Sequence, residues 1–217
     1  APEDIESAID NSLKSLGVDY VDLYQIHSWN SAYPIADTME TMARLQEAGK
    51  VRFVGVSNFN AAQMQQAYEI VPFHSNQPRY NLFDRGVEGE DLAYCGKMGI
   101  GILPHSPLAK GLLTGKYTPG HTFPDDDERS DRPRFQGALF AQYLAVTEQL
   151  KGVAGDKGIS MVQLAIAWLL RRSEVTCVLV GAKNPDQVKE HLGAAEVQFS
   201  EDELNRMDEI LQHTPEG

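Results

Sequence analysis

Hydrophobic and polar positions follow two different periods along the chain. Five short runs of apolar, β-branched and aromatic residues predict strands at 21–27, 51–57, 73–77, 99–105 and 175–181. Apolar residues at helical spacing predict helices at 4–16, 35–48, 61–70, 88–97, 140–153, 160–172, 184–195 and 201–211. Ser200, with Glu203 three residues later, predicts a capping box at the start of the last helix.

Strands that alternate with helices predict a parallel sheet with crossover helices. A doubly wound open sheet and a β/α barrel both fit this alternation. The dinucleotide fingerprint of the open sheet is missing, because Gly99 and Gly101 precede a strand's apolar core and do not open a helix. Segment 111–117 is one residue short of a phosphate-binding P-loop and ends in Tyr117. A barrel has eight strands, so five strands would mean that its N-terminal part is missing.

Composition restricts the class of protein. The 217 residues are 42% hydrophobic, and 31 acidic residues against 19 basic ones give a net charge of −12. This balance argues against a nucleic-acid partner, and any anionic ligand must be held by a local device. No apolar run approaches 18 residues and no signal-peptide pattern opens the chain, so we expect no membrane partner. The two cysteines form no metal or redox motif, which predicts no metal site and fits a cytoplasmic location.

Polar residues stand at the C-terminal tips of all five predicted strands, where a barrel carries its functional groups. They include His27, Ser57, Gln77, His105 and Lys183. Polar residues commonly end strands without any function, but five such tips together favour a ligand site.

Apart from His105, these residues lie in motifs with a characteristic order and spacing. The motifs occupy 19–27, 49–52 with 55–59, 76–77, 80–81, 106–108, 111–116 and 181–190. The chain resembles the aldo-keto reductase family over its whole length, and within it the bacterial reductases related to the potassium-channel β-subunit. The resemblance implies an α/β fold of the (β/α)8 TIM-barrel type. Residues 1–217 would form one domain, the C-terminal two-thirds of a barrel: about five parallel strands, without the first three.

The same resemblance implies roles for individual residues. His27 matches the active-site histidine that orients or polarises the substrate carbonyl, and Trp29 matches a substrate-pocket residue, although it could instead pack under a loop. The implied cofactor-binding residues are Ser57, Asn58, Gln77, His105, Ser106, Leu108, Gly111, Leu113, Lys116, Gly181, Lys183, Asn184, Gln187 and Glu190.

These cofactor-binding residues divide by the part of the cofactor they would hold. Ser57, Asn58 and Gln77 would hold the nicotinamide carboxamide, and His105 stands where the family usually has an aromatic ring, most often Tyr. Ser106, Leu108, Gly111, Leu113 and Lys116 would wrap the pyrophosphate. Lys183 would meet a 2′-phosphate, which favours NADP over NAD.

Other features of the chain depart from the family pattern or leave alternatives open. His191 replaces the family's Asn, and Gln187 with Glu190 could simply form a solvated helix face. Segment 117–135, rich in Pro, Asp and Arg, is either a lid or a disordered loop.

No residue in the chain matches the family's proton-donating Tyr or the Lys and Asp that work with it. Tyr24 lies three residues before His27, so strand alternation predicts that the two face opposite ways. Lys50 precedes a strand and is expected at the other end of the barrel.

The leading functional hypothesis is an NADPH-dependent oxidoreductase that reduces small-molecule aldehydes or ketones to alcohols by hydride transfer. The alternative is an NADP-binding regulatory or redox-sensing subunit of the same fold with little turnover. An unrelated barrel enzyme is a third possibility. Two exposed sheet edges in an incomplete barrel would favour self-association.

Overall fold

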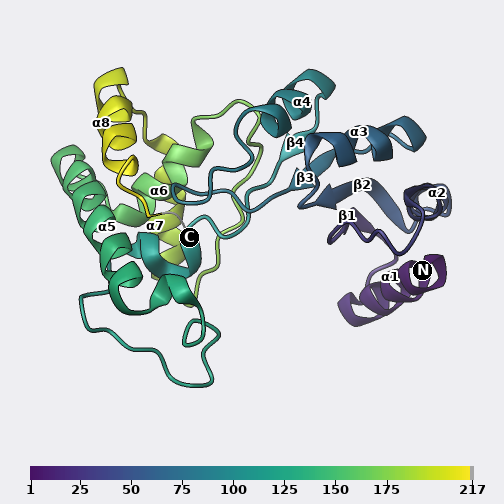
Figure 1. Cartoon of the computed structure of the whole chain (residues 1–217). Helices are drawn as coiled ribbons and strands as arrows, with labels where there is room; N and C mark the ends of the chain where they lie inside the picture. The colour runs from purple at the N-terminus through teal and green to yellow at the C-terminus, as the bar shows by residue number, and fades with distance from the viewer. Residues whose placement is uncertain (216–217) are drawn as a thin grey trace. The chain divides into compact units, whose positions relative to one another are not determined.

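The computed structural model describes residues 1–215 (Figure 1). Contacts divide the chain into two compact units. Unit 1 contains residues 1–79, 86–103 and 173–177, and unit 2 contains residues 80–85, 104–172 and 178–217. Each unit is described separately.

A parallel sheet forms the centre of unit 1. Its strands are β1 (Val21–Ile26), β2 (Val51–Ser57), β3 (Ser75–Gln77) and β4 (Gly101–Ile102). They lie side by side in chain order, and each pair is parallel. The register places Val21 opposite Val51 and Ser57 opposite Gln77. The ends of β2 and β3 therefore lie next to each other.

Four helices alternate with these strands: α1 (Pro2–Leu16), α2 (Ile35–Glu47), α3 (Ala61–Ile70) and α4 (Glu90–Met98). Their apolar stripes supply fully buried side chains such as Ile9, Met42 and Met64, and Val54 and Val56 of β2 are equally buried. Strand order that follows chain order without a reversal is typical of a β/α barrel, whereas a doubly wound sheet reverses at its switch point.

The described sheet has four strands, so the prediction of five is wrong for segment 175–181. Val175 forms an isolated parallel bridge with Ile102 in unit 1, and Leu179 forms another with His105 in unit 2. A continuous ladder needs a donor and an acceptor at alternate residues. Pro104 has no N–H to donate, so regular pairing cannot continue past it.

Unit 2 is mainly helical. Its elements are η1 (Ala109–Thr114), η2 (Pro133–Phe135), α5 (Gly137–Lys157), α6 (Met161–Leu170), α7 (Pro185–Gly193), η3 (Ala194–Glu196) and α8 (Glu201–Leu211). The apolar helix α6 lies in the core, where Leu164 and Leu169 have no exposed surface and Trp168 packs on Tyr80 with ring centroids 5.5 Å apart. The long α5 adds Leu150, and α8 adds Met207.

Three helices begin with a reciprocal capping box, in which the first side chain accepts a backbone N–H and the fourth residue returns the bond. The pairs are Asn60 with Gln63, Ser160 with Gln163, and Ser200 with Glu203. The capping box expected for the last helix is therefore confirmed. Among the described residues, no single helix is long and apolar enough to cross a bilayer, and α5 with α6 meets that test only as a pair bent by 87°.

Candidate functional site

Eight of the expected cofactor residues line one cleft in unit 2. The cleft has a volume of about 490 Å³ and is built from segment 106–116 and from the chain that leads into α7. We call it the lysine cleft. Its expected lining residues are Ser106, Leu108, Gly111, Lys116, Gly181, Lys183, Gln187 and Glu190. The other lining residues are Pro107, Lys110, Thr114, Val162, Leu179, Val180 and His191.

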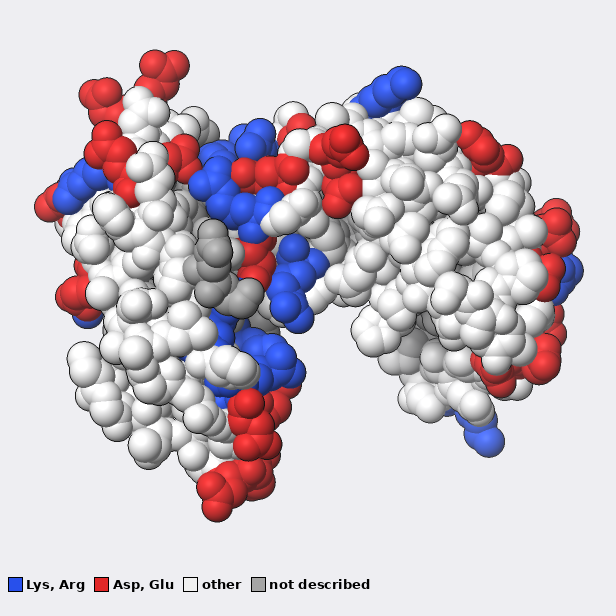
Figure 2. Space-filling view, viewed as in Figure 1, with Lys and Arg blue, Asp and Glu red and all other residues white. Residues whose placement is uncertain are grey.

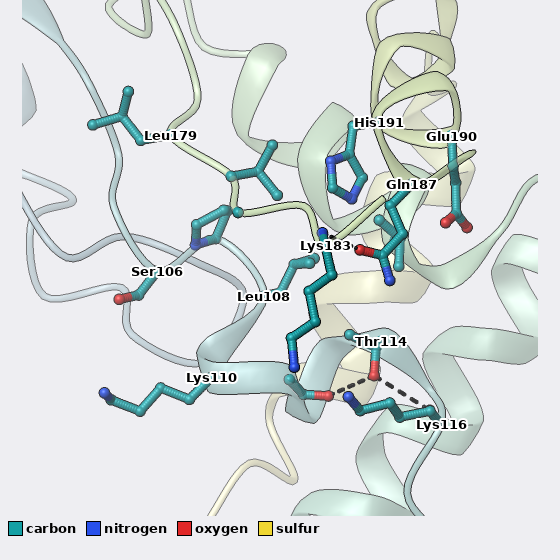
Figure 3. A pocket seen from close by; sticks show the side chains of 15 residues that line it. Ser106, Leu108, Lys110, Thr114, Lys116, Leu179, Lys183, Gln187, Glu190 and His191 are labelled. Carbon is teal, nitrogen blue, oxygen red and sulfur yellow. Dashed lines mark hydrogen bonds between the residues drawn. The ribbon is translucent and has the colours of Figure 1, made fainter. Parts of the chain in front are cut away.

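Three lysines concentrate positive charge in this cleft. Figure 3 shows Lys183 reaching from the segment before α7 toward η1, near Thr114 and Lys116. Lys183 is exposed, and the Lys116 ammonium lies 4.9 Å from the centre of the Tyr117 ring. Elsewhere acidic side chains dominate, and Figure 2 shows basic side chains only in small groups on the viewed face. The cleft is thus a local group of basic side chains in an acidic protein.

The backbone beside the lysine cleft is strained. Ser106, Ala109 and Lys110 have φ values of 58°, 45° and 55°, in the left-handed region that non-glycine residues rarely adopt. Asn58 is the fourth such residue within 1–215, and it also belongs to the expected cofactor set. Side chains hold this path: Asn81 Nδ2 donates to the Ser106 carbonyl at 3.0 Å. A strained backbone lowers the stability of the protein, so it persists only where the surrounding structure holds it in place. Such positions cluster at functional sites.

The start of α7 forms another wall of the cleft. Asn184 Oδ1 accepts the backbone N–H of Gln187 at 3.0 Å, and Gln187 Oε1 accepts the backbone N–H of Lys183 at 2.7 Å. These bonds fix the turn that presents Lys183. A helix N-terminus also contributes a partial positive charge, which adds to the attraction for an anion.

Some expected cofactor residues lie outside the lining of the lysine cleft. The side chain of Leu113 is fully buried in the core, so only its backbone could face a ligand. Asn184 caps α7. His105 is half-buried, with Nδ1 3.0 Å from Ser106 Oγ, and is not among the lining residues.

The sequence analysis missed Lys110, although it lines the cleft. Its ammonium group pairs with Glu128 from segment 117–135. The lysine itself was visible in the sequence, but nothing in the pattern indicated the left-handed turn that places it at the edge of the cleft. Its hydrogen bond to Glu128 is the main reason why the pKa of that carboxyl lies below its usual value.

Segment 117–135 is held by ion pairs and aromatic contacts. Arg129 donates to the Asp127 carboxylate, to Tyr117 Oη at 2.5 Å and to the Lys110 carbonyl at 3.2 Å. The hydrogen bonds from Arg129 hold the pKa of Asp127 well below its usual range. The Phe123 ring lies 5.2 Å from the Tyr117 ring. These contacts give the segment a defined structure.

The other two arginines of this segment are also paired with carboxylates. Arg132 Nη2 lies 2.8 Å from Glu128 Oε2, and Arg134 makes two bonds of 2.9 Å to Asp84. Their charges are therefore balanced within unit 2.

Unit 1 contains the second group of expected site residues, at the ends of β1, β2 and β3. Ser57 is buried, and its hydroxyl donates to the Gln77 carbonyl at 2.7 Å. Asn58 Nδ2 lies 3.0 Å from Ser57 Oγ and 3.3 Å from the His27 carbonyl. Gln77 Nε2 donates to Gln25 Oε1 at 2.8 Å. Hydrogen bonds therefore connect Ser57, Asn58 and Gln77 to one another and to β1.

His27 and Trp29 line a separate cleft of about 340 Å³ within unit 1. The His27 side chain is exposed, and the Trp29 ring packs edge-on against Phe59 with centroids 5.3 Å apart. The two residues expected near the substrate are thus brought together. Trp29 combines both roles considered for it, since it packs on Phe59 and also lines the cleft.

Tyr24 lies on β1, and the cleft that contains His27 is lined by the whole run 24–30, so the prediction that the two side chains face opposite ways stays a prediction. Burial raises the pKa of Tyr24, which makes its hydroxyl a weaker acid. Lys50 behaves as expected, since it precedes β2 and pairs with Asp10 at 2.5 Å.

Each unit, taken by itself, offers groups that suit one part of a dinucleotide. The lysine cleft combines three ammonium groups and a helix start with apolar side chains such as Val162 and Leu179, a mixture that suits phosphates attached to a flat ring. The amide and hydroxyl groups of Gln77, Asn58 and Ser57 match a neutral carboxamide, which needs both a donor and an acceptor.

Comparison with known proteins identifies the family. The model of the aldo/keto reductase family matches residues 1–212, and the chain belongs to this family. It is 41% identical over 186 residues to the aldo-keto reductase YhdN of Bacillus subtilis (strain 168), covering 85% of this chain and 56% of that protein.

Two further relatives carry a cofactor in their names. The chain is 32% identical over 203 residues to the aldo-keto reductase yakc [NADP(+)] of Schizosaccharomyces pombe, covering 92% of this chain and 60% of that protein. It is 31% identical over 216 residues to the NADH-specific methylglyoxal reductase of Escherichia coli (strain K12), covering 98% and 65%. The chain thus spans less than two thirds of the length of these relatives.

A solved structure agrees with the family assignment. The glycerol dehydrogenase AKR11B4 from Gluconobacter oxydans superposes with a TM-score of 0.91 at 35% identity, covering 100% of this chain and 66% of that one. Together with the parallel sheet in chain order, this similarity supports the barrel over the doubly wound sheet.

Proposed function

We propose that the chain belongs to an NADPH-dependent oxidoreductase that reduces small aldehydes or ketones to alcohols. The lysine cleft is the observation that carries this proposal. Lys116 and Lys183 line the cleft beside a helix start in a protein with a net charge of −12, an arrangement that favours a polyanionic cofactor, whereas the Lys110 ammonium is paired with Glu128. The family match runs through both units, which supports treating residues 1–217 as one barrel domain.

When bound, the nicotinamide cofactor supplies the hydride for the carbonyl carbon. The chain's own residues bind and orient. Ser57, Asn58 and Gln77 would hold the carboxamide, so that one face of the ring is presented. The exposed imidazole of His27 would donate a hydrogen bond to the carbonyl oxygen, which favours charge developing there. Because no residue matches the family's Tyr, the proposal assigns no proton donor within 1–217.

NADP is proposed over NAD because Lys183 provides a charge for the 2′-phosphate. The relatives do not decide this point, since one is named for NADP(+) and another is NADH-specific. The relatives named for methylglyoxal and glycerol point to a small polar carbonyl as substrate. The regulatory alternative is less well supported, because all these relatives are named as reductases or dehydrogenases. A cytoplasmic location stays a prediction.

A titration of protein fluorescence with NADPH and NADH tests the proposal. Two unit charges 4 Å apart interact by about 1 kcal/mol in water and about 4 kcal/mol near a protein surface. Lys183 is exposed, so about 1–2 kcal/mol is expected. Lys183→Met should therefore weaken NADPH binding about 5- to 30-fold and leave NADH binding within about two-fold.

Lys189→Met is the matched control. Lys189 is an exposed lysine of α7 that pairs with Asp186 and does not line the lysine cleft. This variant removes the same charge from a position six residues further along the chain and should leave both affinities unchanged. Absence of saturable NADPH binding to the wild type would refute the proposal. Equal loss of NADPH affinity in the two variants would refute the role of Lys183. Saturable binding without turnover of any small carbonyl would favour the regulatory alternative.

A further inference from the structure

Three polar side chains form a bridge across the sheet of unit 1. Gln25 lies on β1, whereas Ser75 and Gln77 lie on β3, with β2 between them. Gln25 Nε2 donates to Ser75 Oγ at 3.0 Å and to the Val56 carbonyl at 3.3 Å. Gln77 Nε2 donates to Gln25 Oε1 at 2.8 Å. Gln25 therefore spans the central strand and contacts an expected cofactor residue on the far side.

Gly55 of β2 makes this crossing possible. A Cβ at this position would overlap Ser75 Oγ and would lie only 3.1 Å from Gln25 Cγ. Any other residue would therefore fill the space that Gln25 uses to reach β3. The bridge depends on a glycine at this position for its close approach, not for an unusual backbone angle.

The hydrogen bonds of the bridge fix which way each amide points. The Val56 carbonyl can only accept, so Gln25 must present its NH₂ group there. The Gln25 side-chain oxygen then points at Gln77, which must donate a hydrogen bond to it from its own NH₂ group. A flipped Gln77 would place two amide oxygens against each other. The network thus leaves the Gln77 oxygen as the acceptor that is not used within the bridge.

We propose that Gln25 is a positioning residue that holds the Gln77 amide with its oxygen available to the NH₂ of the cofactor's carboxamide. The inference rests on the proposed function. It extends the site from the strand ends to Gln25, a half-buried residue of β1 that also borders the cleft of His27. The neutral carboxamide, and not the phosphates, is the part of the cofactor that Gln25 would help to recognise.

The test compares two cofactors that differ only in this group. NADP⁺ carries a carboxamide, whereas its 3-acetylpyridine analogue carries a methyl ketone and has no N–H to donate. The substitution Gln25→Met removes both polar atoms and keeps the length of the side chain. Because one hydrogen bond is at stake, Q25M should weaken NADP⁺ binding about 3- to 10-fold and analogue binding by less than about two-fold. Dissociation constants come from fluorescence titration, so turnover is not needed.

Ser75→Ala is the matched control. It removes one acceptor of Gln25 Nε2 and leaves the Val56 carbonyl, which fixes the polarity of the bridge. S75A should therefore bind both cofactors within about two-fold of the wild type. Circular dichroism checks that Q25M is folded. If it is not, Gln25→Asn gives the same comparison, since it keeps an amide that is one methylene too short to reach Gln77.

The outcomes separate this inference from the function on which it rests. Selective loss of NADP⁺ affinity in Q25M supports it. Equal loss for both cofactors would mean that Gln25 only maintains the sheet, and this would overturn the inference while the proposed function stands. Selective loss in S75A as large as in Q25M would also overturn it. A wild type that binds neither cofactor would overturn both proposals.

Discussion

Replacing Gly55 by Ala should destabilise the protein strongly, although it adds only one methyl group. The added carbon would lie 2.9 Å from the Ser75 carbonyl oxygen and 3.1 Å from Gln25 Cγ, and it would overlap Ser75 Oγ. The carbonyl belongs to the backbone of the neighbouring strand, so it can yield only if the strand moves. The Ser75 hydroxyl can rotate away, but it then loses its bond from Gln25.

The size of the effect follows from two costs. Overpacking a well-filled interior costs about 1–3 kcal/mol. Loss of the bonds that join Gln25 to Ser75 and Gln77 costs about 0.5–1.5 kcal/mol for each bond. We expect G55A to lower the free energy of unfolding by about 2–4 kcal/mol. This is a large fraction of the unfolding free energy of a natural domain, which is about 5–15 kcal/mol.

Gly152→Ala is the matched control because it makes the same chemical change in open space. Gly152 lies within α5, is exposed, and would bring its Cβ near no atom within 4 Å. Alanine favours a helix over glycine by about 1 kcal/mol, so G152A should stabilise the protein. Urea unfolding followed by circular dichroism measures both variants. A G55A protein as stable as the wild type would refute the claim that Gln25 needs the space above Gly55.

Two further predictions concern titratable groups. Burial raises the pKa of the Cys95 thiol to about 12, whereas Cys177 is exposed. A thiol reagent at pH 8 should therefore label one cysteine in the native protein and two in urea. Rapid labelling of both cysteines without urea would contradict this prediction. The pKa values of Asp127 and Glu128 are lowered by Arg129 and Lys110, so their stabilising effect is present above the usual carboxyl pKa of about 4 and is lost as pH falls through the folded-state values. An Asp127→Asn, Glu128→Gln double variant tests this effect. The difference in unfolding free energy between the wild type and this variant should be constant from about pH 5 to 8 and shrink below about pH 4. A difference that does not vary with pH would contradict the prediction.

The sequence predicted elements well where one local signal dominates. The helix predicted at 61–70 from apolar spacing has these bounds in the structure, where Asn60 and Gln63 form a capping box at its start. The strand at 51–57 was also found at its observed bounds, since its composition is strongly β-forming. Segment 175–181 has similar composition, but pairing depends on the neighbouring chain. Pro104 interrupts that pairing, and only Val175 and Leu179 form bridges.

The candidate site was only partly readable from the sequence. Motif resemblance pointed to Lys183 and Lys116, which line the lysine cleft, but it also named Leu113, whose side chain is buried. Lys110 was missed because its direction comes from a run of left-handed residues that no residue pattern announces. Gln25 was missed for a different reason. Its importance arises from bonds to residues 50 and 52 positions away in the chain.

The turn before α7 limits how cofactor preference could be redesigned. Gln187 would be an obvious position to change near the adenosine, yet its side chain also fastens the backbone of Lys183 and its own N–H is held by Asn184. A substitution there would loosen the turn and alter affinity for every dinucleotide at once. The contribution proposed for Lys183 would come from the far end of its long side chain, which makes no hydrogen bond to a described residue that would hold the turn in place. Engineers seeking an NADH-preferring variant would do best to start at Lys183 and leave Gln187 in place.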